Sequence, residues 1–235
     1  MDSTEICKWL HEVLEKLPLI KIKSSFDIKE LPKDGIYFFY EEGETWGHGG
    51  NKPRIVRIGS HKKGNFRTRI KSHYLFNESR IDKMSLDRPK PADGSIMRNH
   101  IGKALLAKRD RSYIDIWTKS LTSRENRTKY RALRNIELEK ELEIEISKII
   151  REKFSFRFIK VPNGSEVMGK KFEGNIIGTL SHCSLCHKSN NWLGNNSNID
   201  KIRESGLWLC QHLRDAPLDD NQKELIEKFV ADTLD

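Results

Sequence analysis

The stretch that decides the fold reads Asp34-Gly35-Ile36-Tyr37-Phe38-Phe39-Tyr40. Its first two residues, with the lysine before them, are typical of a turn. The run that follows is β-branched and aromatic, and such a run predicts a strand. Residues 41–53 are polar and rich in glycine, which predicts a hairpin connection. A second strand is predicted over residues 54–59, which read Arg-Ile-Val-Arg-Ile-Gly.

The rest of the chain is mainly helical in pattern, with one more strand. Residues 154–159 alternate apolar and polar side chains, which predicts a third strand. We expect residues 77–94 to form a polar surface loop and residues 118–130 to be a mobile or solvated segment. The outline is an α/β fold with a charged helical insertion between strands two and three. Apolar residues recur at helical spacing over residues 3–17, 66–75, 95–107, 131–153, 168–181 and 219–234.

The composition is that of a globular protein with a basic excess. The chain has 235 residues and a formal net charge of +9, which favours a polyanionic partner. The first residues are acidic and polar, unlike a secretory signal, and no apolar run approaches the roughly 20 residues of a membrane span. Four cysteines are too few for a disulfide scaffold. These features predict a soluble, cytoplasmic protein with reduced thiols and no membrane contact.

Five side chains supply the groups that phosphodiester hydrolysis requires. Tyr37 and Arg57 lie on adjacent predicted strands, where an antiparallel pairing would place them on one face. Arg69 and His73 are four residues apart on a predicted helix and therefore share a helical face. Glu173, on a later helix, is a candidate ligand for one divalent metal ion. Taken singly, each has a structural explanation, since strand tyrosines usually serve packing and charged helix residues usually face solvent.

The order of these groups resembles the GIY-YIG nuclease family, and the likeness spans about residues 30–213. Each motif alone is weak, but their shared order is fairly specific. The resemblance implies a small three-stranded antiparallel sheet flanked by helices. It divides the chain into a helical extension (1–30), a nuclease domain (31–213, insertion about 109–153) and a C-terminal helix (214–235). The motifs are residues 34–38, 54–61 and 69–73, with four more that resemble a stand-alone prokaryotic branch: 94–102, 172–177, 191–194 and 205–208.

The resemblance also implies a DNA endonuclease that uses one Mg²⁺ or Mn²⁺ ion. Tyr37 matches the family tyrosine that acts as general base or positions water, and Arg69 matches the arginine that contacts the scissile phosphate. His73 matches a histidine that some branches use as an extra base or as the partner of the tyrosine. Glu173 matches the metal-binding glutamate. Asn191 is the candidate for a late polar residue found in some members.

Arg57 is the main departure from the family pattern, which has a tyrosine at that place in the second motif. A cation there would favour the ionised form of Tyr37 or bind phosphate, and it would equally fit a protein that has lost activity. We prefer the first interpretation because the other four candidate residues are all kept. His61, just past the motif, is predicted either to reach the same cleft or to be a plain turn residue.

A basic cluster lies beside the predicted site and suits contacts to a phosphate backbone. We expect any sequence preference to come from the loop 77–94 and the insertion 109–153. A restriction, defence or repair role is expected, and a homodimer would supply the two sites that cutting a duplex often requires. The predicted substrate-binding residues are Lys62, Lys63, Arg67, Lys71 and Asn191.

Cys183 and Cys186 form a C-x-x-C motif, with Cys210 and His212 downstream. These four residues could complete a tetrahedral zinc site, although a single C-x-x-C favours ordinary thiols instead. Two alternatives to an active nuclease therefore stay open. One is a nucleic-acid-binding module that kept the fold and lost catalysis. The other is a structural or partner-binding protein that zinc stabilises.

Overall fold

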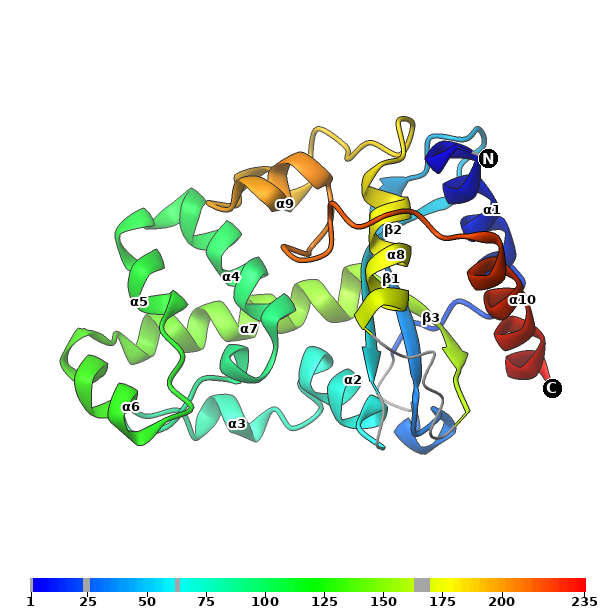
Figure 1. Cartoon of the computed structure of the whole chain (residues 1–235). Helices are drawn as coiled ribbons and strands as arrows, with labels where there is room; N and C mark the ends of the chain where they lie inside the picture. Colours follow the sequence, from blue (N-terminus) through cyan, green and yellow to red (C-terminus); the bar gives the residue numbers. More distant parts are fainter. Residues whose placement is uncertain (1, 23–25, 62–63, 163–169) are drawn as a thin grey trace.

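A sheet of three antiparallel strands forms the centre of the molecule. The computed structural model describes residues 2–22, 26–61, 64–162 and 170–235. β1 lies in the middle of the sheet, in the order β2-β1-β3. The predicted three-stranded antiparallel sheet is therefore confirmed, and Figure 1 shows it with helices on both sides. The strands are β1 (Gly35–Thr45), β2 (Pro53–His61) and β3 (Phe154–Lys160).

Pairing between β1 and β2 fixes which side chains share a face. Tyr37 pairs with Gly59, and Phe39 pairs with Arg57. Because side chains alternate along a strand, Tyr37, Phe39 and Arg57 lie on one face of the sheet. Phe38 points to the opposite face and into a different core. The register thus places Tyr37 and Arg57 together, as an antiparallel pairing predicts.

One face of the sheet is covered by both terminal helices and by a helix from late in the chain. These are α1 (Ser3–Glu15), α10 (Asp220–Leu234) and α8 (Lys170–Ser181). Figure 1 shows α8 in front of the sheet, with α1 and α10 side by side at one end. Their apolar side chains share one core with Phe38 and Ile58 of the sheet. Both terminal helices are therefore part of the packed fold.

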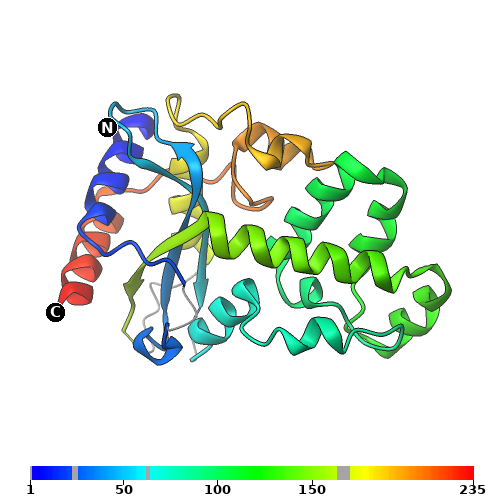
Figure 2. The same cartoon turned by 180° about the vertical axis from the view of Figure 1, so that it is seen from behind.

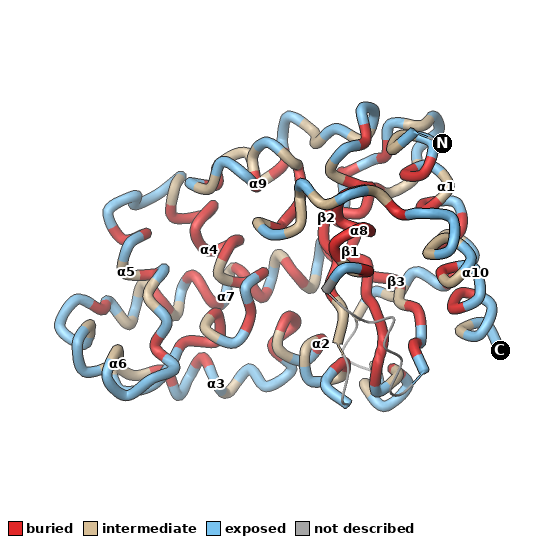
Figure 3. The backbone as a smooth tube through the Cα atoms, viewed as in Figure 1, coloured by how far each residue is buried: buried red, intermediate tan, exposed pale blue. Residues whose placement is uncertain are grey.

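The other face is covered by helices that lie between β2 and β3 in the chain. Three of them, α2 (Phe66–Tyr74), α4 (Ile96–Arg109) and α7 (Ile136–Lys153), share a core with Tyr37 and Phe39. In Figure 2, α7 crosses this side of the molecule and runs directly into β3. Figure 3 shows that the buried segments of α4 and α7 face the interior. The shorter helices are α3 (Ser79–Asp82), α5 (Ile114–Thr118), α6 (Arg124–Tyr130) and α9 (Asp200–Ser205).

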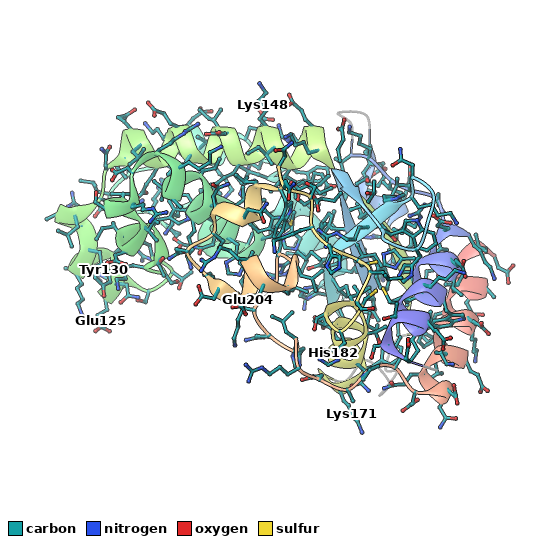
Figure 4. All side chains as sticks on the ribbon, turned by 90° about the horizontal axis from the view of Figure 1, so that it is seen from above. Glu125, Tyr130, Lys148, Lys171, His182 and Glu204 are labelled. Atoms are coloured by element: carbon teal, nitrogen blue, oxygen red, sulfur yellow. The ribbon has the colours of Figure 1, made fainter. Side chains whose placement is uncertain are left out.

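Two segments contain more regular structure than their composition predicts. Residues 77–94, expected to be a polar loop, contain α3 and a buried Lys90 whose ammonium lies 2.9 Å from the Asp93 carboxylate. Residues 118–130, expected to be mobile or solvated, are largely exposed and contain α6, whose cap is the Ser123 hydroxyl. Local capping and ion pairing stabilise these turns without an apolar stripe, so hydrophobic periodicity does not reveal them. Figure 4 shows α6, with Glu125 and Tyr130, at the end of the molecule farthest from the sheet.

A buried ion pair joins the inserted helices to the helix that follows β2. Arg98 on α4 and Glu143 on α7 are fully buried, and their Nη2 and Oε2 atoms lie 2.5 Å apart. The same guanidinium donates to the carbonyl of His73 at 3.2 Å. The same carboxylate accepts the N–H of Ala92 at 2.6 Å. The pair therefore fixes α2 and the turn before α4 relative to α7.

Replacing Arg98 with methionine is expected to lower the free energy of unfolding by about 3–5 kcal/mol, because it leaves the Glu143 carboxylate buried without its partner. Urea unfolding followed by circular dichroism measures the change. Arg109 on the same helix is the matched control, since its pair with Glu145 is half exposed. Arg109→Met should cost less than about 1 kcal/mol. Equal losses in the two variants would contradict the assignment of a structural role to the buried pair.

Candidate active site

Tyr37 lies on the middle strand with its ring buried and its hydroxyl in a defined contact. The Tyr37 Oη lies 2.9 Å from Nε2 of His73. Gly59, its partner on β2, makes this placement possible, because a Cβ there would lie 2.2 Å from the same oxygen. The glycine of the second motif therefore makes room for the tyrosine of the first.

His73 connects Tyr37 to the start of α4. It is fully buried on α2, and its Nδ1 lies 2.8 Å from the Ser95 hydroxyl, which also caps α4. Burial, reinforced by the positive charges of Arg57 and Arg69, holds the pKa of His73 well below its usual value. The imidazole is therefore neutral at physiological pH. It contacts the Tyr37 hydroxyl through one nitrogen and the Ser95 hydroxyl through the other.

His61 and Arg69 meet at the end of β2. Nε of Arg69 donates to Nε2 of His61 at 3.0 Å, so that nitrogen carries no proton. The His61 ring stacks on Tyr37, with centroids 6.2 Å apart and planes 14° from parallel. Burial, and then the charges of Arg69 and Arg57, lower the pKa of His61 to about 4. Of the two alternatives for His61, the structure therefore favours a place beside the candidate catalytic residues.

The low pKa of His61 predicts a titration that can be measured directly. In an NMR titration, its ring should protonate near pH 4 and stay neutral from about pH 5 upwards. Arg69→Met removes one of the two positive charges that lower the pKa, so the midpoint should move upwards. Lys71→Met, an exposed change on the same helix, should leave it unmoved. A wild-type midpoint near the ordinary value of about 6.5 would contradict this placement of the ring.

The side chain of Arg57 is buried beneath this group of side chains and is only 5% exposed to solvent. Its Nη1 donates to the carbonyl of Trp208, and the N–H of Trp208 donates to the carbonyl of Val56 at 2.8 Å. Arg57 thus ties the segment around Trp208 to β2. Its charge contributes to the low pKa of both neighbouring histidines, and to that of His100, whose pKa burial lowers to about 3.

Glu173 approaches the end of β2 from α8, on the other side of this edge strand. It is half-buried, and its carboxylate accepts a hydrogen bond from the Ser60 hydroxyl. It lines a cleft of about 940 Å³ together with His182 and Glu204, which lie on the same side of the molecule in Figure 4. One carboxylate beside a hydroxyl, in an open polar cleft, suits a Mg²⁺ ion that keeps several of its waters. The residues present therefore fit a hydrated divalent ion.

The three last residues of β2 gather the candidate side chains from three elements. Gly59 packs against Tyr37 of β1, Ser60 donates a hydrogen bond to Glu173 of α8, and His61 accepts one from Arg69 of α2. Because side chains alternate along the strand, Glu173 lies on one side of this edge and the tyrosine on the other. Glu173, His61 and Arg69 are half-buried at this edge, and Tyr37 is buried beneath the His61 ring.

Comparison with known proteins assigns the fold to a family. A family model described as a GIY-YIG domain matches residues 3–235. The chain belongs to the GIY-YIG family. Membership indicates a nuclease-type function, and the match includes both terminal helices of this GIY-YIG domain. No curated protein and no solved structure matches the chain. Among the described residues, no helix has both the length and the apolar character needed to cross a bilayer.

The other predicted substrate-binding residues of the GIY-YIG domain are dispersed. Lys62 and Lys63 lie outside the described residues. Arg67 donates to the carbonyls of Leu31 and Lys29 at 2.6 and 2.7 Å, so its guanidinium is engaged by the protein itself. Lys71 is exposed on α2 near Arg69.

Asn191 lies apart from the GIY-YIG motifs at β2. It is exposed and lines a separate hollow of about 540 Å³, together with Glu42 and Glu145. None of the five catalytic and metal-binding candidates named from the sequence, nor His61, lines that hollow. Nearby, the indoles of Trp192 and Trp208 both donate to the buried carboxylate of Glu41, at 2.8 and 2.9 Å. This part of the GIY-YIG domain is a packed polar contact.

The zinc ligands predicted from the sequence need correction. Cys183 and Cys186 lie together, but Cys210 lies 3.5 Å from His100 and His212 lies 2.7 Å from Asp215. The residues that join the C-x-x-C motif are Cys7 and His48. Neither carries a local metal-binding signature, because Cys7 sits within an amphipathic helix pattern and His48 in a glycine-rich loop.

Proposed function

We propose that this protein is a DNA endonuclease that hydrolyses phosphodiester bonds with one Mg²⁺ or Mn²⁺ ion. The observation that carries the proposal is the gathering of a tyrosine, an arginine and a carboxylate at the end of one edge strand. Family membership and the net charge of +9 support a nucleic-acid substrate. Tyrosine and arginine can position water and phosphate, and the carboxylate can hold the ion.

Tyr37 is proposed to position the attacking water. A neutral His73 with its proton on Nδ1 accepts the Tyr37 hydroxyl proton in a hydrogen bond at Nε2, which leaves the Tyr37 oxygen free to accept one from water. The water oxygen forms a bond to phosphorus while the bond from phosphorus to the leaving sugar oxygen breaks; the attacking water loses its proton to solvent, and the leaving oxygen takes one from solvent. The buried histidine is a poor store for a proton, so its role is to orient Tyr37.

Arg69 is proposed to bind the scissile phosphate. Its Nε is held by His61, and its Nη1 donates to the carbonyl of Gly94 at 3.2 Å, which orients the guanidinium. Arg69 is half-buried and lines a hollow of about 400 Å³ with Ser95 and Asn99. A guanidinium fixed in this way stabilises negative charge that develops on the phosphate.

Glu173 is proposed to hold the divalent ion, with Ser60 supporting its carboxylate. Once bound, the ion would polarise the phosphate and stabilise the leaving oxygen. The metal ion in this proposal is Mg²⁺ or Mn²⁺, because a carboxylate and water are ligands that both accept.

Arg57 supports a second candidate, a binding module without catalysis, because it is buried where the family pattern has a tyrosine. We favour an active enzyme, since Arg57 adds its charge to the effects that keep both histidines neutral beside Tyr37. The two candidates differ in one measurement. Supercoiled plasmid incubated with Mg²⁺ or Mn²⁺ should be nicked or linearised, and EDTA should stop the reaction. Salt-sensitive binding without cleavage, across both metals and several nucleic acids, would support the module instead.

The same proposal includes a restriction, defence or repair role in the cytoplasm and a homodimer that cuts both strands. The order of the reaction tests the dimer. If two chains act together, the rate at which linear plasmid forms should rise with the square of protein concentration below the dimer's dissociation constant. A first-order dependence throughout would indicate a monomer that cuts one strand at a time.

A further inference from the structure

We propose that Cys7, His48, Cys183 and Cys186 form a structural zinc site, separate from the site of cleavage. One nitrogen or sulfur atom from each of the four lies within 4.8 Å of all the others. The residues come from three parts of the chain: α1, the loop between β1 and β2, and the turn after α8. Three cysteines and one histidine are a common ligand set for structural Zn²⁺.

Two distances within this group match those of a tetrahedral zinc site, and the remaining ones are all within 4.8 Å. Bonds of about 2.3 Å to sulfur and about 2.0 Å to nitrogen imply about 3.8 Å between two sulfurs and about 3.5 Å between sulfur and nitrogen. The sulfurs of Cys7 and Cys186 lie 3.8 Å apart, and Nε2 of His48 lies 3.4 Å from the Cys183 sulfur. A disulfide between Cys7 and Cys186 would need about 2.05 Å and would leave Cys183 and His48 unexplained.

Backbone N–H groups lie near two of the sulfurs. Those of Leu185 and Cys186 are near the Cys183 sulfur, and that of Gly47 is near the Cys186 sulfur. Gly47 packs so closely that a Cβ there would lie 1.8 Å from the carbonyl oxygen of Leu185. N–H donors stabilise the negative charge that three thiolates bring to one ion. The loop that carries His48 is thus fitted against the C-x-x-C turn.

His11 supports the position of Cys7 from behind. Its Nε2 accepts the N–H of Ile55 at 3.2 Å, so its Nδ1 carries the proton and donates to the Cys7 carbonyl at 2.9 Å. His11 therefore links α1 to β2 one turn from the proposed ligand. A buried polar contact of this kind orients a metal ligand indirectly.

The position of the site explains what zinc would do. It would fasten α1 and the β1–β2 loop to the end of α8, the helix whose first turn carries Glu173. These segments are far apart in the sequence, so linking them restricts the unfolded chain strongly. The zinc would stabilise the helix layer on this face of the sheet without taking part in cleavage.

Metal analysis of the full chain tests the proposal. Protein prepared without a metal-affinity tag should contain about one zinc ion per chain. Its X-ray absorption should show about three sulfurs at about 2.3 Å and one nitrogen at about 2.0 Å. Cys183→Ser and His48→Gln should lower the zinc affinity by about 10²-fold or more, measured by competition with a chromophoric chelator. Cys210→Ser is the matched control, because this half-buried cysteine lies elsewhere, and it should keep the zinc.

These measurements read the zinc site without any cleavage assay, so they are independent of the proposed nuclease activity. The proposal is wrong if reduced wild-type protein takes up neither zinc nor cobalt, or if Cys210→Ser loses zinc as readily as Cys183→Ser. It is also wrong if a disulfide joins the cysteines in freshly prepared protein. Should a variant fail to fold, the absorption spectrum of the wild-type protein still decides the ligand set.

Discussion

Phenylalanine in place of Tyr37 is expected to lower the rate of DNA cleavage by about 10²- to 10⁴-fold. The variant removes only the hydroxyl that contacts His73 and that we propose orients the attacking water. The ring that packs against Phe39 and Phe66 stays in place, so the fold should be kept. Plasmid nicking under single-turnover conditions measures the rate, and unfolding in urea checks the stability.

Tyr40→Phe is the control for this prediction. Tyr40 is a buried tyrosine on the same strand, but its side chain belongs to the core on the opposite face of the sheet. Its ring lies under the Arg157 guanidinium, 4.9 Å from the ring centre, and away from the candidate site. Cleavage should therefore be unchanged. If both variants lost activity equally, loss of packing would explain the result and Tyr37 would have no specific role.

DNA binding provides a second readout for Tyr37→Phe. The basic surface and Arg69 are unchanged in this variant, so its affinity for DNA should stay close to that of the wild type. A lost rate with kept affinity is what removal of a group acting on the attacking water predicts. Loss of affinity in proportion to the rate would assign Tyr37 to substrate binding.

The sheet could be predicted from the sequence because local residue patterns indicate each of its strands. Residues 36–40 and 154–159 have strand composition or alternation, and the glycine-rich loop after residue 40 indicates a hairpin. The hairpin brings the two motifs side by side, but the register shifts between Thr45 and Tyr40 and again between Tyr40 and Phe39 before Tyr37 pairs with Gly59. The adjacency of the two motifs therefore follows from local pattern, whereas the pairing of Tyr37 with Gly59 depends on these irregularities of the strand.

The supporting residues of the candidate site could not be predicted in the same way. Ser60 and Ser95 contact Glu173 and His73 across gaps of 113 and 22 residues, and a serine has no pattern that reveals such a partner. Arg57 pairs with a backbone carbonyl, which any residue offers. Contacts of this kind depend on tertiary packing alone.

Charge patterns were misleading for the inserted helices. Residues 131–153 carry both signs of charge, a pattern common on solvated helices, yet Glu139 and Glu143 of α7 are buried and paired with Arg134 and Arg98. A buried ion pair looks like a surface pair in the sequence, because both have the same composition. The same limit applies to the cysteines, since Cys7 is separated from Cys186 by 179 residues.

Glu173→Gln is expected to lower the metal-dependent rate by about 10³-fold, because the loss of a bound ion's charge stabilisation costs several kcal/mol of the barrier. Glutamine has the shape of glutamate, and its amide oxygen can still accept the Ser60 hydroxyl proton, so the fold should be intact. A raised Mn²⁺ concentration should restore part of the rate, since the remaining ligands bind the ion weakly.

Glu204→Gln is the matched control. Glu204 lies on α9 and lines the same cleft, and its replacement removes the same negative charge. Its rate and its dependence on Mg²⁺ should equal those of the wild type. Mn²⁺ binding followed by electron paramagnetic resonance should show one site in the wild type and in Glu204→Gln, and a weakened one in Glu173→Gln. The zinc content should stay at about one ion per chain in all three proteins. Unchanged Mn²⁺ binding and full activity in Glu173→Gln would place the divalent ion elsewhere and overturn the role of Glu173.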